Sequence, residues 1–326
     1  MFVKPVKFPY YVAQYEAFAR RVRPGATHDS VEEQFKNYRA GFNGEKSLIP
    51  YLAALPDKDY YMIHDLRLSN RVHDFQIDYL LLHPQSIVIL EVKNIAGILS
   101  LDFLTHTLTR KFNDKIETFQ DPLVQTEKLK QQLQDWLYAN FYSLPEIPIN
   151  DLVVFSSPST YINFLNMHEA QNRRIIRGPQ VTRKITGISR PYRQAKPLLS
   201  TKNLRTIANR LVAAHRPKTI DLISDGTLLP EDIVRGVRCP KCGRIPMLRT
   251  NHSWCCPSCR KNSQTAHIDS LRDYQLIYGP KISNAQCRDF LRLESESTAR
   301  YFLQSASIKQ EGANRNRTYF LNLSEK

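Results

Sequence analysis

The chain has 326 residues, 42% of them hydrophobic and 24% charged, and it contains no apolar run long enough to span a membrane. Lys and Arg outnumber Asp and Glu by 46 to 31, a balance that favours polyanionic partners. The length exceeds one typical hydrophobic core, so we expect two or three domains. The first residues lack the apolar segment of a signal peptide, and we expect a cytoplasmic protein.

Residues 1–40 are expected to form a helical extension, after which a new helical pattern begins around Glu45. The apolar residues of this pattern share one face: Leu48, Tyr51, Leu52 and Leu55. A glutamate is favourable in the first turn of a helix, because the helix dipole attracts negative charge there. Glu45 therefore has a structural interpretation beside any functional one.

A β-hairpin is predicted for residues 75–93. Two runs of β-forming residues, 75–82 and 87–93, flank a turn that contains Pro84. A turn of four residues places Leu82 opposite Ile87, and the pairs then continue outward along the two strands.

This register brings three charged residues to one face of the hairpin. Asp78 lies opposite Glu91, and Lys93, two residues further on, points to the same side. Opposed carboxylates repel each other, but a divalent cation converts the repulsion into ligation, and hard oxygen ligands suit Mg²⁺ or Mn²⁺. Lys93 can then orient a water or stabilise charge on a phosphate. The structural alternative is a surface salt bridge between Lys93 and Glu91.

Further along, a hairpin-like stretch at 97–112 precedes a predicted helix at 122–140 and a strand at 150–156. The helix has an apolar stripe at a spacing of four residues: Leu129, Leu133 and Leu137. Gln125 continues this stripe, so it is either a site residue or a buried amide with satisfied hydrogen bonds. Together with a strand at 60–67, the pattern predicts an α/β fold with a mixed sheet flanked by helices.

A basic segment follows at residues 161–218, with 13 basic residues and one acidic residue, Glu169. Charge of one sign attracts nucleic acid, although a solvated face or an anionic protein partner would give the same pattern. We predict nucleic-acid contacts from five residues of this segment: Arg173, Arg174, Arg177, Arg183 and Lys184.

Several stretches resemble the PD-(D/E)xK nuclease superfamily and, within it, the nuclease-related domain, NERD. They are "GFNGEKSLIPYLAALPDKDYYMIHDLRL", "DFQIDYLLL", "IVILEVKNIAGIL", "QDPLVQTEKLKQQL" and "DLVVFSSPST". Ile77 stands where the nominal superfamily motif has proline. The resemblance covers about residues 40–215, and we place the domain, with its basic segment, at 41–218.

The resemblance implies a restriction-endonuclease-like fold and a role for each matching residue. Asp78 and Glu91 match the metal-binding carboxylates, and Lys93 matches the catalytic lysine. Glu45 matches an acidic residue on the helix before the sheet, and Gln125 a polar residue on the helix after it.

Two C-x-x-C pairs, Cys239/Cys242 and Cys256/Cys259, are separated by 13 residues. This spacing predicts a four-thiolate Zn²⁺ site in a small ribbon at 237–262, which follows a linker at 219–236. Four protein ligands leave no open position for chemistry, so the ion is expected to be structural.

Residues 268–326 are predicted to form a small third module. Helices are expected at 268–277, 284–291 and 297–304, followed by two strands around a Gly/Asn turn, a pattern typical of a winged helix-turn-helix. Arg315 and Arg317 would lie on the wing, within reach of nucleic acid. The alternative is a small packing or oligomerisation domain, because the module's charge is nearly balanced.

Two classes of function stay open. In the first, the chain is a metal-dependent nuclease, with DNA as the first choice of substrate. In the second, it is a non-cleaving regulator that binds nucleic acid through a nuclease-like core. The complete set of Asp78, Glu91 and Lys93 favours the nuclease. The sequence shows no ATPase motif, so a helicase or motor would be a separate partner.

Overall fold

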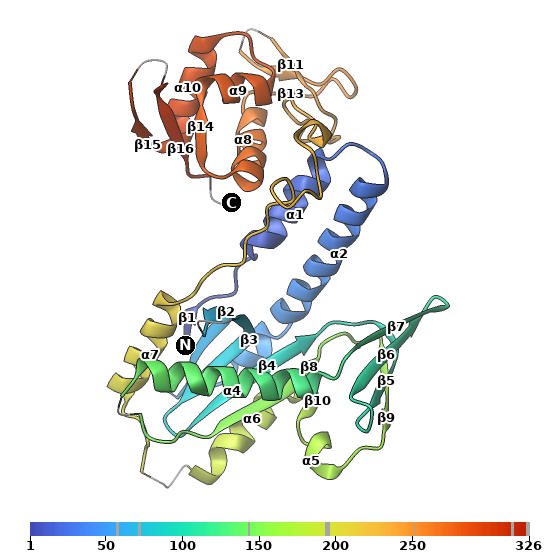
Figure 1. Cartoon of the computed structure of the whole chain (residues 1–326), viewed down its shortest axis with the longest axis vertical. Helices are drawn as coiled ribbons and strands as arrows, with labels where there is room; N and C mark the ends of the chain where they lie inside the picture. Colours follow the sequence, from blue (N-terminus) through green and yellow to red (C-terminus); the bar gives the residue numbers. More distant parts are fainter. Residues whose placement is uncertain are drawn as a thin grey trace. The chain divides into compact units, whose positions relative to one another are not determined.

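The computed structural model describes residues 1–56, 59–70, 73–142, 144–192, 196–250, 252–313 and 316–323. The chain divides into two compact units that do not follow chain order. The first unit comprises Met1–Pro9 and Tyr38–Lys218, and the second comprises Tyr10–Asn37 and Thr219–Lys326. Helix α2 (Ala26–Lys46) contributes residues to both units (Figure 1).

The first unit is built on a six-stranded mixed sheet with the order β1-β2-β3-β4-β8-β10. The strands are β1 (Phe2–Lys4), β2 (Tyr61–Ser69), β3 (Asp74–His83), β4 (Ser86–Lys93), β8 (Ile149–Phe155) and β10 (Ile175–Arg177). Strands β2, β3 and β4 are antiparallel neighbours, whereas β4, β8 and β10 are parallel. The predicted hairpin register is confirmed, since Leu82 pairs with Ile87. Strand β1 lies within residues 1–40, where only helix was expected.

A second sheet of four strands extends from this core in the order β7-β6-β5-β9. Its strands are β5 (Gly97–Asp102), β6 (Thr107–Phe112), β7 (Lys115–Gln120) and β9 (Thr160–Leu165). The hairpin-like stretch of the sequence supplies β5 and β6, and β9 joins β5 in parallel after the chain has passed through β8. Figure 1 shows this sheet beside the ends of β4 and β8.

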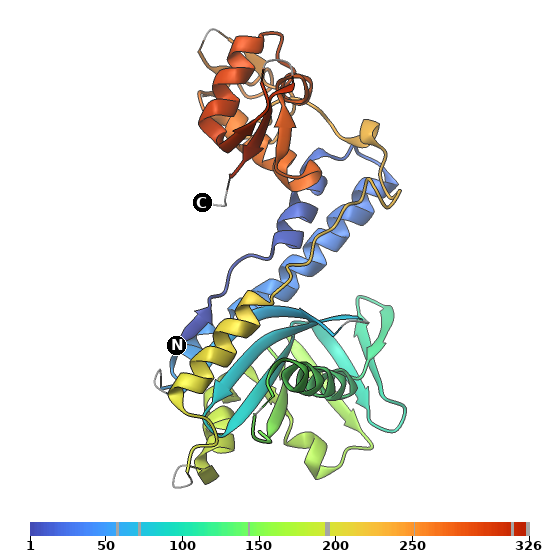
Figure 2. The same cartoon turned by 60° about the vertical axis from the view of Figure 1, so that its left-hand side comes forward.

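Helices cover both faces of the six-stranded sheet, which confirms the predicted α/β class. The helices of this unit are α3 (Ile49–Ala53), α4 (Pro122–Asn140), α5 (Glu169–Asn172), α6 (Val181–Ser189) and α7 (Thr201–Ala213), with short 3₁₀ turns at Gly178–Gln180 and Arg190–Tyr192. One face packs against α4 and α7 through residues such as Leu133 and Leu211, and the other packs against α3 and α6 through Leu52 and Ile185. Figure 2 shows α4 and α7 in front of the sheet.

The second unit combines a small ribbon with helices and a three-stranded sheet. It contains α1 (Tyr10–Arg21), a 3₁₀ turn (Pro230–Asp232), the ribbon strands β11 (Leu248–Arg249), β12 (Trp254–Cys255) and β13 (Asn262–Ser263), then α8 (Ala266–Tyr278), β14 (Lys281–Ser283), α9 (Asn284–Leu291), α10 (Glu296–Ala306), β15 (Ser307–Glu311) and β16 (Thr318–Leu321). The last three strands form an antiparallel sheet in the order β14-β16-β15.

A continuous core joins the parts of the second unit. Trp254 of the ribbon is buried, and its indole nitrogen lies 3.4 Å from His267 Nδ1 of α8. The His267 ring stacks on Phe302 of α10, with 3.7 Å between the ring centroids. The buried Arg21 of α1 pairs with Asp273 of α8 and donates a hydrogen bond to the carbonyl oxygen of Gly236. The ribbon is thus packed into the same unit as the helices.

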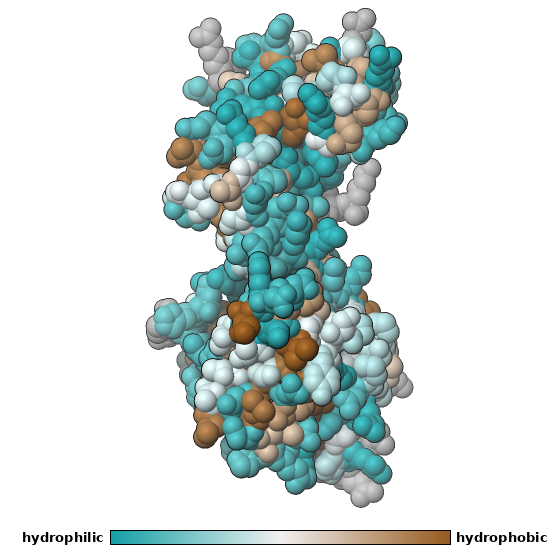
Figure 3. Space-filling view, turned by 90° about the vertical axis from the view of Figure 1, so that its right-hand side faces the viewer, coloured by the Kyte–Doolittle hydropathy of each residue, from teal (hydrophilic) through white to brown (hydrophobic). Residues whose placement is uncertain are grey.

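The surface in Figure 3 is mostly hydrophilic, and apolar groups on that face are small and separate among the described residues. Across the same parts of the chain, no helix has the length and apolar character needed to cross a bilayer.

Candidate active site and metal centres

Strands β3 and β4 separate where the charged residues begin. The last pair of their ladder is Tyr79 with Leu90, and Asp78 is outside the ladders on both sides of β3. The backbone N–H of Val92 donates instead to the Asp78 carboxylate, with 2.8 Å between nitrogen and Oδ2. Burial, followed by the charges of Glu91 and Glu45, raises the pKa of Asp78 well above its ordinary value. Burial and mutual repulsion thus disfavour the charged forms of the carboxylates on this side of the sheet.

Glu91, Lys93 and Gln125 form a closed triangle of hydrogen bonds. Lys93 Nζ donates to Glu91 Oε1 and to Gln125 Oε1, and Gln125 Nε2 donates to Glu91 Oε1, each at 2.8 Å. Glu91 is 4% exposed, so its charge is held in a nearly dry environment by these two donors. The triangle fixes the Lys93 ammonium at the end of β4.

Helix α4 brings Gln125 to this position because of how the helix begins. The Asp121 carboxylate accepts a hydrogen bond from the Leu123 N–H, and Pro122 occupies the first turn. With the start fixed, Leu129 and Leu133 pack on the sheet, and Gln125, one turn earlier on the same stripe, lies over the end of β4.

Glu45 lies in the last turn of α2, so the expectation that it opens a helix is wrong. A carboxylate is disfavoured there by the helix dipole, which removes the structural explanation for this glutamate. Gly44 allows the close approach of α2 to the sheet, since a Cβ atom at this position would lie 2.4 Å from Asn94 Cβ and 2.8 Å from Ser156 Oγ. Burial, followed by the charges of Asp65 and Glu91, raises the pKa of Glu45 to about 8.

His64 of β2 is a site residue that the sequence did not reveal. Its Nε2 lies 2.7 Å from Glu45 Oε2, and the residue is 1% exposed. Burial lowers the pKa of His64 to about 4, so the ring is neutral at pH 7. The Tyr79 hydroxyl donates to the Glu45 carbonyl oxygen at 2.8 Å, and Lys4 Nζ donates to the His64 carbonyl oxygen at 2.7 Å. A single histidine in a strand gives no pattern, and only packing places it beside Glu45.

The donor set fits a hard divalent cation. Asp78 and Glu91 supply two carboxylates, and Mg²⁺ is commonly held by one or two carboxylates with waters completing its shell. Within the described ranges, groups of three or more ligand side chains within 4.8 Å of one another occur twice, at the four cysteines and at His28, Asp29 and Glu32. The carboxylates of this site do not form such a group.

Residues 40–156 match the family model of the nuclease-related domain. This segment is a NERD domain. The match confirms the resemblance seen in the sequence, and the description of the family suggests a nuclease-related function and nucleic-acid binding for this segment. No curated protein and no solved structure matches the chain. The matched span contains all six residues of the site: Glu45, His64, Asp78, Glu91, Lys93 and Gln125.

Outside the NERD domain, four cysteines of the second unit converge as their spacing predicted. Their sulfur atoms all lie within 4.8 Å of one another, with 3.6 Å between Cys239 and Cys259 and between Cys242 and Cys256. A tetrahedral site with Zn–S bonds of 2.3 Å requires sulfurs about 3.8 Å apart. The cluster therefore fits a small zinc-binding module.

The two cysteine turns are built alike. In the first, the Cys239 N–H donates to the Arg244 carbonyl oxygen, and the Gly243 N–H donates back to the Cys239 carbonyl oxygen. In the second, Cys256 bonds in the same way with Lys261 and Arg260. Gly243 and Arg260 occupy the same place in each turn, and both have positive φ, 75° and 55°. The turns thus hold their sulfurs in equivalent positions.

The basic residues at the end of the NERD domain's unit separate into different environments. A pocket of about 570 Å³ between β8 and α6 is lined by Arg173, Arg174, Arg183 and Lys184. Arg174 is already engaged, since it donates to Asp151 Oδ2 and to Glu127 Oε1. Arg177 does not line this pocket, because its guanidinium donates to the carbonyl oxygens of Ser157 and Thr160. Arg317 belongs to the second unit, and Arg315 lies outside the described residues.

Proposed function

We propose that the NERD domain is a metal-dependent nuclease that hydrolyses phosphodiester bonds of DNA. The hydrogen-bonded triangle of Glu91, Lys93 and Gln125 beside Asp78 carries this proposal. Asp78 and Glu91 would hold Mg²⁺ or Mn²⁺. Such an ion supplies a Lewis acid for phosphate oxygens and lowers the pKa of a bound water.

Lys93 is the residue that acts directly on the reacting groups. Its ammonium has three N–H donors, and the bonds to Glu91 and Gln125 use two of them. The Lys93 side chain is 21% exposed, so the remaining donor can reach a water or a phosphate oxygen. A fixed positive charge of this kind stabilises charge that develops on the phosphate in the transition state.

Glu45 and His64 position the site rather than react. The His64 ring and the Tyr79 hydroxyl hold Glu45 at its carboxylate and at its carbonyl oxygen. The carboxylate adds negative charge near Asp78, which strengthens attraction for a cation. A domain that only binds nucleic acid gains nothing from this concentration of buried negative charge.

Binding of substrate would involve both units. In the first unit, Arg173, Arg183 and Lys184 surround a basic pocket that attracts phosphates. In the second, structural Zn²⁺ would hold the ribbon. The order of helices and strands from α8 to β16, with β16 in the middle of its sheet, supports a winged-helix module with Arg317 beside the wing.

Cleavage by the purified chain tests the proposal directly. Plasmid, linear duplex and single-stranded DNA should be cut with Mg²⁺ and not with EDTA. Glu91→Gln and Lys93→Met should each lower the rate at least about a hundredfold, because each removes a group that stabilises the transition state. Glu117→Gln, a carboxylate change on the second sheet, should leave the rate unchanged.

Cleavage by Glu91→Gln at the wild-type rate would refute the site. Wild-type protein that binds DNA but cuts none of the substrates would instead favour a non-cleaving regulator.

A further inference from the structure

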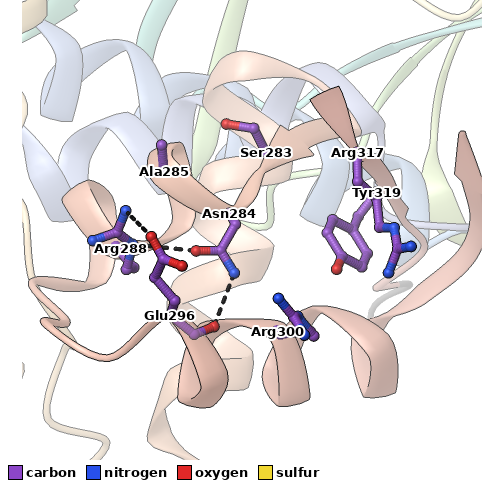
Figure 4. Close-up of a pocket in the computed structure, with 8 residues that line it drawn as sticks. All are labelled: Ser283, Asn284, Ala285, Arg288, Glu296, Arg300, Arg317 and Tyr319. Atoms are coloured by element: carbon purple, nitrogen blue, oxygen red, sulfur yellow. Dashed lines mark hydrogen bonds and ion pairs between the residues drawn. The ribbon is translucent and has the colours of Figure 1, made fainter. Parts of the chain in front are cut away.

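A basic pocket also lies within the second unit. It has a volume of about 590 Å³ and opens between α9, α10 and β16 (Figure 4). Its lining residues are Ser283, Asn284, Ala285, Arg288, Glu296, Arg300, Arg317 and Tyr319. Three guanidinium groups, from α9, from α10 and from the residue before β16, thus surround one concave space.

Among the described residues, two of these arginines have no partner of opposite charge. Arg288 donates to the Glu296 carboxylate at 3.3 Å and to Asn284 Oδ1 at 3.2 Å, so its charge is compensated. In the described part of the chain, no carboxylate lies within ion-pair distance of Arg300 or Arg317. Figure 4 shows both side chains beside the Tyr319 ring at the same end of the pocket. The pocket therefore carries two uncompensated positive charges.

The start of α9 adds to the attraction for an anion. Ser283 caps this helix by accepting a hydrogen bond from the Gln286 N–H, and Ser283, Asn284 and Ala285 of this helix start line the pocket. The N-terminal end of a helix carries partial positive charge. Arginine side chains and helix N-termini both attract phosphate groups, whose oxygens accept hydrogen bonds and carry negative charge.

The lining favours a polymer backbone over a small molecule. Pockets for small molecules are lined mainly by apolar and aromatic side chains, whereas here alanine and one tyrosine are the only such residues. Helix α10 continues from Arg300 on the pocket rim to Tyr301, which is 69% exposed, and to the exposed Gln304. An α-helix fits the major groove of B-form DNA but not the narrow major groove of A-form RNA.

We propose that Arg300 and Arg317 bind a backbone phosphate of duplex DNA in this pocket and so bring α10 to the major groove. The proposal rests on the proposed function for its choice of nucleic acid. It deepens that function by naming duplex DNA as the form that the second unit holds.

The test measures binding without cleavage. The full chain, loaded with zinc and kept free of Mg²⁺, is titrated by fluorescence anisotropy with duplex DNA, duplex RNA and single-stranded DNA of equal length. Arg300→Glu with Arg317→Glu should weaken duplex DNA binding at least about tenfold. It should also reduce the slope of log affinity against log salt by about one, the value for one phosphate that is no longer neutralised.

A matched control is available in the same unit. Arg23→Glu with Arg292→Glu makes the same change in net charge at exposed arginines that do not line the pocket, and it should keep the wild-type affinity and slope. Zinc content and the emission of the two buried tryptophans, Trp136 and Trp254, show whether each variant is folded.

Unchanged duplex DNA affinity in the pocket variant, or an equal loss in the control, would overturn the proposal. An equal loss on duplex RNA would also overturn it, because the groove argument applies to B-form DNA alone. Failure of the nuclease proposal gives a different result, in which no substrate is cut while the difference between pocket variant and control persists.

Discussion

Replacing Glu45 with glutamine should stabilise the metal-free NERD domain at neutral and alkaline pH. The pKa of Glu45 is raised from 4.5 to about 8, so the folded state holds this proton more tightly than the unfolded chain does. The contribution of Glu45 to the free energy of unfolding is therefore fully present below pH 4.5 and is lost as the pH rises from 4.5 to 8. Glutamine has the same shape and can bond to His64, but it does not ionise.

The size of the effect follows from the two pKa values. Each unit of pKa difference corresponds to about 1.4 kcal/mol, so ionisation of Glu45 lowers the free energy of unfolding by about 3 kcal/mol at pH 7 and about 4 kcal/mol at pH 8. The Glu45→Gln substitution should recover most of this lost free energy of unfolding. His64 titrates in both proteins, so its contribution cancels in the difference.

Urea unfolding in EDTA at pH 6, 7 and 8 provides the measurement, followed by hydrogen exchange in peptides from β3 and β4. These peptides report on the first unit alone. The difference between the urea midpoints of the variant and the wild type should increase with pH. Mg²⁺ should reduce this difference, because it stabilises the folded wild type. A difference that stays constant from pH 6 to 8 would refute the assignment of buried, repelling charge to Glu45.

Three further changes test other parts of the structure. Cys256→Ser should remove the one zinc expected per chain and unfold the ribbon, with a loss on the order of 10 kcal/mol of binding free energy. Elemental analysis measures the zinc, and Trp254 emission reports on the ribbon. An unaltered emission spectrum in protein without zinc would contradict the prediction. His64→Phe should slow cleavage about tenfold to a hundredfold, because Glu45 loses its hydrogen-bond partner, whereas His64→Asn should retain more activity. Equal cleavage rates for the two variants would exclude a positioning role for His64. Arg183→Glu with Lys184→Glu should reduce the slope of log DNA affinity against log salt by about one for each phosphate that these side chains neutralise. An unchanged slope would mean that the pocket between β8 and α6 binds another partner.

Local patterns were enough to predict the β3–β4 hairpin, helix α4 and the cysteine cluster. The β3–β4 register followed from two dense β-forming runs and a short turn, because a shift of one residue would turn every buried side chain outward. Helix α4 followed from Pro122 and its leucine stripe. The zinc-binding cluster followed from spacing, since each C-x-x-C turn presents two sulfurs without help from distant residues.

The packing of distant segments determined the positions and partners of several residues that no local sequence pattern indicates. Glu45 has its place because α2 ends against the sheet at Gly44, and His64 reaches it across 19 residues of sequence. The basic segment shows the same limit. The sequence shows that this segment is positively charged but not which residues its side chains contact. In the fold, Arg174 pairs with Asp151, whereas Arg183 is exposed and lines a pocket.

The sequence by itself thus determined the class of fold, the hairpin with Asp78, Glu91 and Lys93, and the four cysteines. Each depends on interactions between residues close in the chain or on a strict alternation along a strand. Tertiary structure alone decided the fourth strand of the second sheet, the His64–Glu45 contact and the pocket of Arg300 and Arg317. These join segments far apart in sequence, and their positions are fixed only when the buried faces of several elements pack together.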